Sequence, residues 1–328
     1  MAVTNPTSFL DKDWIVCDST PTSPFYGNCY IEYDNNSAGN QIQMLTSTDG
    51  GITWSGPRVT ADTAHGLGGQ PLVQPNGTVV VPYLADGSAQ IRSFVSTAGG
   101  SSWGSSVLIS SETTHGVGGG MRTSPLPSAD VDGAGKVYVA WQDCRFRNGC
   151  PANDLVFATS TNGTTWSAVQ RVPIDAATST VDHFIPGLTI DASTSGTSAH
   201  LALYYYYFPN SNCTASNCAL DVGFVSSSDG GATWSPGQQI AGPMTVNQVA
   251  ATTQGPMVGD YISASFLNGR AYGVFAIGGP PSGATYNEAM YTVTGGLRAT
   301  GGSRRSDTWT GPLNSTPSRP SRASTTAY

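Results

Sequence analysis

Ser47-Thr48-Asp49-Gly50-Gly51-Ile52-Thr53-Trp54 is a motif that recurs along the chain, and its repetition is the strongest indication of the fold. It returns as Ser227-Ser228-Asp229-Gly230-Gly231-Ala232-Thr233-Trp234, and in weaker form before Trp103 and Trp166. A glycine pair permits a tight turn, and a nearby Asp or Ser side chain can accept hydrogen bonds from the amides of that turn. We therefore interpret the motif, including its aspartate, as a repeated structural turn and not as catalytic machinery.

Alternating apolar strands flank each copy of the turn. The strands directly before the turns are residues 41–46, 90–95, 154–159, 221–226 and 288–293, the last followed by a copy without Trp. Earlier strands lie at 29–33, 78–83, 136–141, 200–206 and 271–277. Several of these are entered through a hairpin turn such as Asn76-Gly77, preceded by a further strand such as 14–17, 188–190 or 261–266.

Each unit thus comprises four antiparallel strands, the composition of one blade of a β-propeller. The sequence predicts an all-β propeller of four-stranded antiparallel blades, with five repeat units recognised and five or six blades in the ring. We assign residues 1–297 to the propeller. Residues 298–328 are rich in Gly, Ser and Arg, and we interpret them as a flexible tail or the remnant of a closing blade around Trp309.

Composition excludes several classes of protein. The 328 residues include 40 Gly and 21 Pro, and only 11% are charged, with a net charge of −7. This excludes a coiled coil and argues against nucleic acid and anionic membranes as partners. The chain also contains no apolar run of about 18 residues, the length that spans a membrane. We expect a secreted protein, although residues 1–10 do not form a signal peptide.

Six cysteines fall into three close pairs: Cys17 with Cys29, Cys144 with Cys150, and Cys213 with Cys218. Sequence proximity favours these pairs among the 15 possible pairings of six cysteines. The alternative is zinc, which prefers closer spacing with further Cys or His nearby. We predict three disulfides, hence an oxidising compartment, and no metal or cofactor.

The repeated Ser-x-Asp-x-Gly-x-x-Trp motif resembles the Asp-box, or BNR repeat, of the sialidase (neuraminidase) superfamily of propellers. The resemblance covers about residues 11–297. It implies a tyrosine nucleophile beside a carboxylate, a separate aspartate as acid/base, and arginines that clamp the substrate. Gly255-Pro256 followed by Tyr261 is similar to the nucleophile segment of the family, with Asp260 beside the tyrosine. Asp34 falls near the position of the acid/base residue.

Other features of the family pattern are absent or incomplete. Lys12-Asp13-Trp14-Ile15 stands where the family has Phe-Arg-Ile-Pro. Only Arg122 matches a clamp arginine, at the start of an inner strand. A substrate other than sialic acid is therefore equally compatible with the sequence.

Propeller topology gathers the loops between the second and third strands on one face with the crossovers between blades, and function is expected there. We predict catalytic roles for Tyr261, Asp260, Asp34, Asp13, Asp182 and His183. We predict substrate-binding roles for Arg122, Arg145, Arg147, Lys12, His65 and His115. Arg145 and Arg147 lie in a loop stapled by a cysteine pair, and two guanidiniums suit an anionic sugar.

These residues favour a secreted glycan-active enzyme of sialidase-like architecture, a glycoside hydrolase with carbohydrate as its partner. Two alternatives stay open. One is a polysaccharide lyase acting on uronic acids, with a His or Tyr base. The other is a propeller that binds a glycan without cutting it.

Overall fold

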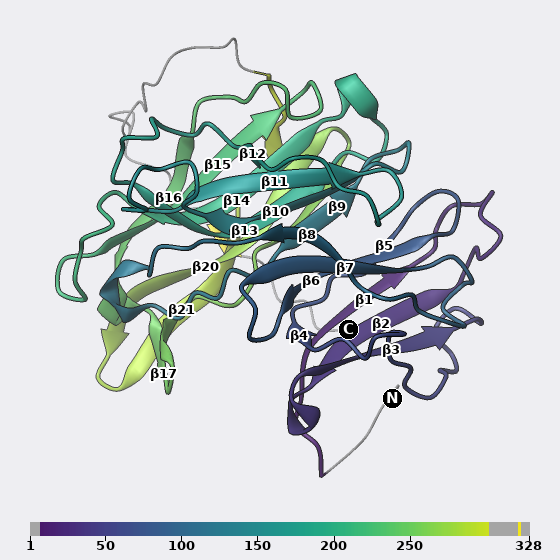
Figure 1. The fold of residues 1–328 in the computed structure, drawn as a ribbon. Helices are drawn as coiled ribbons and strands as arrows, with labels where there is room; N and C mark the ends of the chain where they lie inside the picture. The colour runs from purple at the N-terminus through teal and green to yellow at the C-terminus, as the bar shows by residue number, and fades with distance from the viewer. Residues whose placement is uncertain (1–6, 302–320, 323–328) are drawn as a thin grey trace. The chain divides into compact units, whose positions relative to one another are not determined.

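The computed structural model describes residues 7–301 and 321–322, which form strands, turns and short helical segments (Figure 1). The helical segments among these residues are 3-10 turns: η1 (Asn36–Ala38), η2 (Gly118–Gly120), η3 (Gly196–Ser198) and η4 (Val246–Gln248). Within the same part of the chain, no helix has the length and apolar character needed to cross a membrane.

The strands of the first half form three antiparallel sheets. The first contains β1 (Leu10–Cys17), β2 (Cys29–Asn35) and β3 (Gln41–Ser47). The second contains β4 (Gly66–Leu67), β5 (Leu72–Val73), β6 (Val79–Ala85), β7 (Gln90–Ser96) and β8 (Val107–Ser111). The third contains β9 (Ser128–Val131), β10 (Val137–Asp143), β11 (Asp154–Ser160) and β12 (Gln170–Arg171).

The second half adds two large sheets and a hairpin. The fourth sheet contains β13 (Asp182–Ile190), β14 (Leu201–Phe208), β15 (Ala219–Ser227) and β16 (Gln238–Thr245). The hairpin pairs β17 (Ala250–Thr252) with β18 (Gly255–Met257). The fifth sheet contains β19 (Ser263–Leu267), β20 (Arg270–Ser282), β21 (Thr285–Thr292), β22 (Leu297–Arg298) and β23 (Ser321–Arg322).

The five large sheets are the blades of a β-propeller, so the predicted fold class is confirmed with five blades. In the first blade the place of a fourth strand is taken by an isolated bridge between Met44 and Arg58. The strand predicted at 188–190 begins six residues earlier, at Asp182. The remaining predicted strands are found with ends shifted by a few residues, because ladder hydrogen bonds extend beyond the apolar pattern.

The repeated turns satisfy their own amides with their own side chains. In the copy at Ser227–Trp234, Asp229 accepts hydrogen bonds from the Thr233 amide at 2.8 Å and the Thr233 hydroxyl at 2.6 Å. Ser227 Oγ accepts from the Gly231 amide at 3.0 Å, and the Trp234 indole donates back to the Gly231 carbonyl at 3.1 Å. This pattern gives the aspartate a local structural task, as the sequence indicates.

Two inner strands contain a non-glycine residue in the left-handed backbone region. Lys12 in β1 has φ 54° and Ile185 in β13 has φ 49°. The strand register shifts at both places, between Asp11 and Trp14 and between Phe184 and Gly187. Such bulges re-aim the side chains beside them and are concentrated near functional sites. The bulges therefore indicate that functional residues lie at the beginnings of β1 and β13.

The chain packs as two compact units. Among the described residues, one comprises 7–112, 126–140 and 157–170, and the other comprises 113–125, 141–156, 171–301 and 321–322. In the first unit, Tyr30, Phe94 and Trp103 form the centre of the core, with edge-to-face ring contacts at 6.2 and 5.7 Å. In the second unit, alternating residues of β14 and β15, including Tyr204 and Phe224, fill the core.

The three predicted disulfides are present: Cys17–Cys29, Cys144–Cys150 and Cys213–Cys218. Each closes a short local loop, so sequence proximity was a sufficient guide to the pairing. The predicted division of the chain at residue 297 stays a prediction. Trp309 lies outside the described residues, whereas the backbone of Ser321–Arg322 pairs with β21 opposite Thr292 and Tyr291.

The hydrogen bonds of this turn predict that Asp229 contributes to the free energy of unfolding. Asp229→Ala removes the acceptor for Thr233 and should lower the free energy of unfolding by about 1–2 kcal/mol, because a buried or half-buried turn amide loses its partner. Asp229→Asn keeps one carbonyl oxygen and should lose less. Urea unfolding followed by tryptophan fluorescence measures both values, and equal stability of all three proteins would contradict the structural role.

Candidate functional sites

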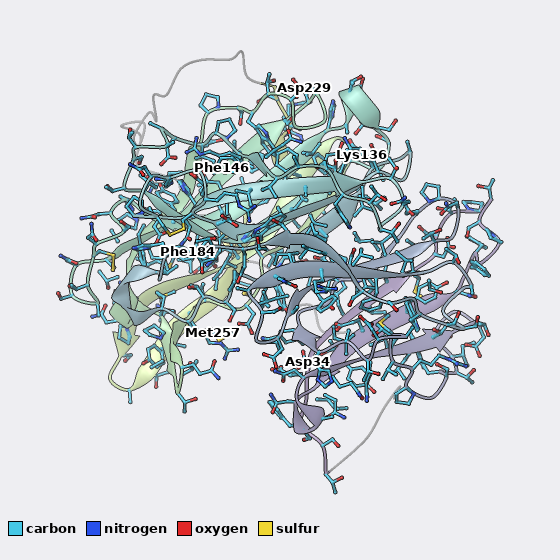
Figure 2. All side chains as sticks on the ribbon, viewed as in Figure 1. Asp34, Lys136, Phe146, Phe184, Asp229 and Met257 are labelled. Carbon is cyan, nitrogen blue, oxygen red and sulfur yellow. A yellow bond between two sulfur atoms is a disulfide. The ribbon has the colours of Figure 1, made fainter. Side chains whose placement is uncertain are left out.

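Four carboxyl groups meet at the start of the first blade, on strands β1 and β2. Glu32 and Asp34 are two residues apart on β2, so their side chains share one face of the strand. Asp11 is the ladder partner of Asp34, and directly paired residues have Cβ atoms about 4.5–5.5 Å apart. Asp13 lies in the bulge of β1, next to Lys12. Figure 2 labels Asp34 in this sheet.

Glu32 and Asp34 are fully buried, and no oxygen of either carboxyl group makes a hydrogen bond of good geometry within the described chain. The backbone amide of Gly69 near Glu32, and that of Asp34 itself, act weakly to lower the two pKa values. Burial, together with the negative charges of Asp11 and Asp86, nevertheless raises the pKa of Asp34 to about 7, against the opposing effect of Lys12. Burial also raises the pKa of Glu32 well above its usual range, with added repulsion from Asp34 and Asp13. The cluster therefore combines proton donors with carboxylates nearer the surface.

Gly69 closes one side of this cluster. A Cβ atom placed on Gly69 would collide with the Glu32 carboxyl carbon and lie 2.6 Å from its Oε1. His65, four residues earlier, is exposed, and its Nδ1 lies 2.6 Å from the Gly39 carbonyl oxygen. In the structure, His65 therefore contacts the loop that contains Gly39. Lys12 lies close enough to Asp34 for its charge to lower the pKa of that carboxyl group, and the predicted functional roles of both residues stay predictions.

A second site lies in the other unit and is organised by Asn153, which is fully buried. Its backbone and side-chain N–H groups both donate to Asp182 Oδ1, at 2.7 and 2.8 Å. Its side chain also makes two hydrogen bonds with the His115 backbone, at 2.7 and 2.9 Å. The result is a clamp that holds Asp182 Oδ2 at 3.5 Å from His115 Nδ1.

His183 is attached to the same clamp. Its backbone N–H donates to the Asn153 carbonyl at 3.1 Å, and its Nδ1 lies 3.2 Å from that oxygen. A carbonyl only accepts, so the proton of the neutral ring belongs on Nδ1. Burial lowers the pKa of His183, whereas burial raises the pKa of Asp182. His115 remains partly exposed at 22%, so it is the member of the group that solvent reaches.

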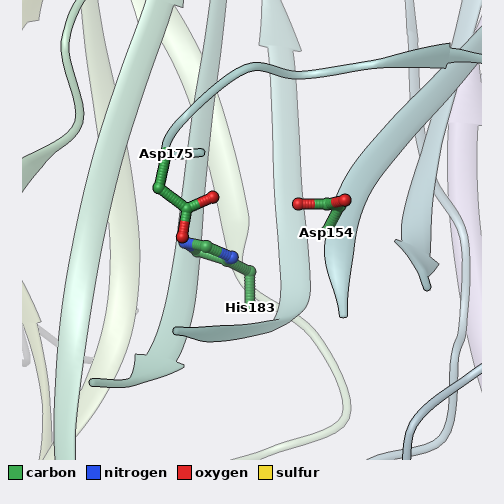
Figure 3. Close-up of side chains that lie close together, drawn as sticks. All are labelled: Asp154, Asp175 and His183. Carbon is green, nitrogen blue, oxygen red and sulfur yellow. The ribbon is translucent and has the colours of Figure 1, made fainter. Parts of the chain in front are cut away.

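Next to this clamp lies a buried ion network of two aspartates and two arginines. Arg147 and Arg171 each bind Oδ1 of both Asp154 and Asp175, at 2.7–2.9 Å. Figure 3 shows Asp175 beside the His183 ring and Asp154 facing it. Atoms of these two aspartates and His183 lie within 4.8 Å of one another, as metal ligands would.

The charges of this network do not suit a divalent metal ion. The two carboxylates are already neutralised by two guanidiniums, so a divalent ion would add two uncompensated charges in a buried place. Arg147 itself has no exposed side-chain surface. Arg147 was predicted to bind substrate. In the structure its guanidinium instead binds Asp154 and Asp175, and these contacts hold the loop between β10 and β11 in place. Arg145 is 27% exposed and forms a bidentate pair with Asp143 at 2.9 and 2.6 Å.

The segment that resembles a sialidase nucleophile has a different local arrangement from the one expected. Gly255–Met257 forms strand β18 of a small hairpin, and the Pro256 carbonyl accepts a hydrogen bond from the Arg122 amide at 2.9 Å. The Arg122 guanidinium donates to Asp260 at 3.1 Å. Arg122, Asp260 and the adjacent Tyr261 are therefore brought to one place, but the arginine is paired with the aspartate.

Sequence reasoning missed Glu32, Asn153, Asp154, Asp175 and Asp221. Glu32 could have been found from its i, i+2 spacing to Asp34 on a strand. Asp221 was noted only as the first residue of a predicted strand. In the structure it is buried, which raises its pKa to about 7, and the Gln239 side chain donates a hydrogen bond to it at 2.6 Å. Asn153 and the two aspartates of the ion network had no sequence signal, because their roles depend on several partners together, at separations from 4 to 38 residues.

Comparison with models of protein families finds no match, and comparison with curated proteins finds none either. Solved structures do share the fold. The α-L-arabinanase of Penicillium chrysogenum bound to arabinobiose has a TM-score of 0.54 and 15% identity, covering 86% of this chain and 77% of that chain. The α-L-arabinofuranosidase of Fusarium graminearum bound to an iminosugar inhibitor has a TM-score of 0.54 and 15% identity, with 87% and 77% covered.

A protein of unknown function from Dyadobacter fermentans has a TM-score of 0.53 and 13% identity, covering 91% of this chain and 81% of that chain. These likenesses show the fold, a β-propeller shared with glycan-processing enzymes, and at such identities they show the fold alone. They do not single out the sialidase superfamily.

The raised pKa of Asp34 predicts how stability changes with pH. Its pKa is about 7 in the folded chain and 3.8 for an unperturbed aspartate, so the folded state binds more protons between these values. The free energy of unfolding should therefore fall as pH rises from about 4 to 7. Asp34→Asn should flatten this slope, and Asp221→Asn, with the same shift, should flatten it separately. Urea titrations at pH 5 and 7.5 measure the difference; an unchanged slope in both variants would contradict the assignment.

The hydrogen bonds of Asn153 predict that loss of its side chain strongly lowers the free energy of unfolding. Asn153→Ala removes three side-chain hydrogen bonds from a fully buried position and leaves Asp182 with fewer donors. We expect a loss of about 2–4 kcal/mol in the free energy of unfolding. The exposed Asn148→Ala is the control and should be near neutral. Comparable unfolding midpoints for the two variants would show that Asn153 is not a clamp.

Proposed function

We propose that the protein is a glycan-active enzyme, a glycoside hydrolase whose proton donor is Asp34. The observation that carries this proposal is a buried carboxyl group with a pKa of about 7 directly opposite a second carboxyl group, Asp11, in the β1–β2 ladder. Most glycoside hydrolases place two carboxyl groups on either side of the bond that breaks, one protonated and one ionised.

The roles follow from burial. Asp34, kept protonated near neutral pH, donates to the glycosidic oxygen as the bond to the leaving group breaks. Asp11 and Asp13 are less buried, and one of them, ionised, stabilises the positive charge that develops on the sugar or activates water. Asp34 is fully buried and its ladder partner Asp11 is partly exposed, so this role requires that substrate binding uncovers Asp34.

The fold supports a carbohydrate substrate. Solved structures of the same fold include enzymes named as an arabinanase and an arabinofuranosidase, bound to arabinobiose and to an iminosugar. Three disulfides support a secreted enzyme, since such bonds persist in oxidising compartments. The fold and the disulfides support a secreted carbohydrate-active enzyme, and neither identifies the sugar.

Sialidase-like chemistry is the finer form of this proposal. It would use Tyr261 as nucleophile, with Asp260 beside it and Arg122 binding the substrate carboxylate. The Arg122–Asp260 pair at 3.1 Å would have to open for that role. Tyr261→Phe distinguishes this form, because it would abolish sialoside cleavage and leave hydrolysis by Asp34 unchanged.

One observation favours a second candidate, a polysaccharide lyase. His115 is partly exposed and is held next to buried Asp182, an arrangement in which a carboxylate orients a general base. Such a base could remove the proton beside the carboxylate of a uronic acid. An unsaturated product, detected by its ultraviolet absorbance and lost in His115→Ala, would favour the lyase over the hydrolase.

The hydrolase proposal predicts a specific loss of turnover. On a panel of fluorogenic glycosides including arabinosides and sialosides, Asp34→Asn and Asp11→Asn should each lower kcat by at least about 100-fold, the usual contribution of a positioned acid or base. Wild-type kcat should fall as pH rises above about 7, because Asp34 then loses its proton. Asp49→Asn, a charge removal in a structural turn of the same unit, is the control.

Full activity in Asp34→Asn, with the pH profile unchanged, would contradict the assigned proton donor. Absence of turnover on every substrate, together with measurable glycan binding, would favour the propeller that binds and does not cut.

A further inference from the structure

The carboxyl cluster of the first blade and its surroundings contain more acidic than basic side chains. Asp34 is influenced by Asp11 and Asp86, and Glu32 by Asp34 and Asp13, which together make five acidic groups. Lys12 is the one cation among the groups that shift these two carboxyls. A substrate at Asp34 therefore meets a field that attracts cations and repels anions.

The two deepest members of the cluster also have few hydrogen-bond partners. Glu32 and Asp34 are 0% exposed, and none of their four oxygens makes a hydrogen bond of good geometry within the described chain. A buried polar group without a partner costs free energy, so a ligand that brings donors to this place is favoured. The required ligand thus carries several N–H or O–H groups, and positive charge adds to its affinity.

We propose that the cluster binds an amino sugar, so that the substrate is a glycan with protonated primary amines; this rests on the proposed function. An ammonium group supplies three donors and one positive charge, which matches orphaned carboxyl oxygens in an acidic place. A neutral hydroxyl supplies the donor without the charge. A sialic or uronic acid would add a like charge beside Asp11 and Asp13 and would be disfavoured.

Binding of the amine is coupled to protons. An ammonium favours the ionised form of Asp34, so its binding releases a proton whenever Asp34 is protonated in the free enzyme. The groups that face Asp34 are Asp11, Lys12 and Asp13 from β1 and Glu32 from its own strand. Asp86 follows β6, and His65 precedes β4. Most of these are acidic, and Asp34 is more often ionised at the higher pH, so affinity for the amine should increase from pH 5 to 7.5.

The test compares three oligosaccharides by isothermal titration calorimetry with the full chain: a tetramer of glucosamine, the same tetramer N-acetylated, and sialyllactose. We expect the glucosamine tetramer to bind at least about tenfold more tightly than the acetylated one, with affinity that weakens in salt. The ratio should grow between pH 5 and 7.5. Asp34→Asn should reduce it to near one, and Asp49→Asn should leave it unchanged.

Asp13→Asn is the second variant, since Asp13 is exposed and its replacement does not disturb a buried position. It should lower the preference for the amine by a smaller factor. Equal binding of the glucosamine and acetylated tetramers, or tighter binding of sialyllactose, would overturn the inference.

The two proposals fail separately. Cleavage of neutral glycosides that depends on Asp34, without any preference for amines, would overturn the inference and retain the hydrolase. Preference for amines with no cleavage of any glycan, including the glucosamine tetramer, would retain the binding site and overturn the hydrolase.

Discussion

The tight turn between the third and fourth strands is the constraint on which each blade depends. A chain that reverses direction in so few residues leaves amides with no ladder partner, and those amides must be satisfied locally. Asp49 and Asp229 do so by accepting from Thr53 and Thr233, while Ser47 and Ser227 accept from the second glycine of each pair. The turn thereby fixes the register of two strands, and the repeated registers make the blades possible.

The same sheets can present chemistry because their inner strands are interrupted. At Lys12 in β1, a left-handed residue shifts the register, so that Asp11 and Asp13 both lie close to the acids of β2. A regular strand would send adjacent side chains to opposite faces. The interruption is therefore what gathers acidic groups at one place, and its backbone strain is compatible with a functional rather than a structural purpose.

The buried acidic groups of the two units differ in their partners. Asp154 and Asp175 are neutralised by Arg147 and Arg171, and Asp182 accepts two hydrogen bonds from Asn153. These groups form a closed network that holds loops in position. Glu32 and Asp34 in the other unit have no ion pair and no hydrogen bond of good geometry among the described residues. Buried carboxyl groups with so few partners cost folding free energy, and this contrast is the reason for placing the proposed site in the first blade.

The repeated motif and its flanking strands were enough to predict the blades, five repeat units and the three disulfides, because these depend on contacts between residues close along the chain. The sequence also indicated Asp34, Asp13, Lys12, His115 and Asp182 as unusual residues in loops or at strand ends. Which groups surround each of these side chains follows from the packing of segments that are distant in sequence. The tertiary structure buried Arg147, paired Arg122 with Asp260, and made Asn153 a clamp, since burial and partners arise from segments up to 138 residues apart. A pKa depends on such surroundings, so no motif could show that the pKa of Asp34 is raised.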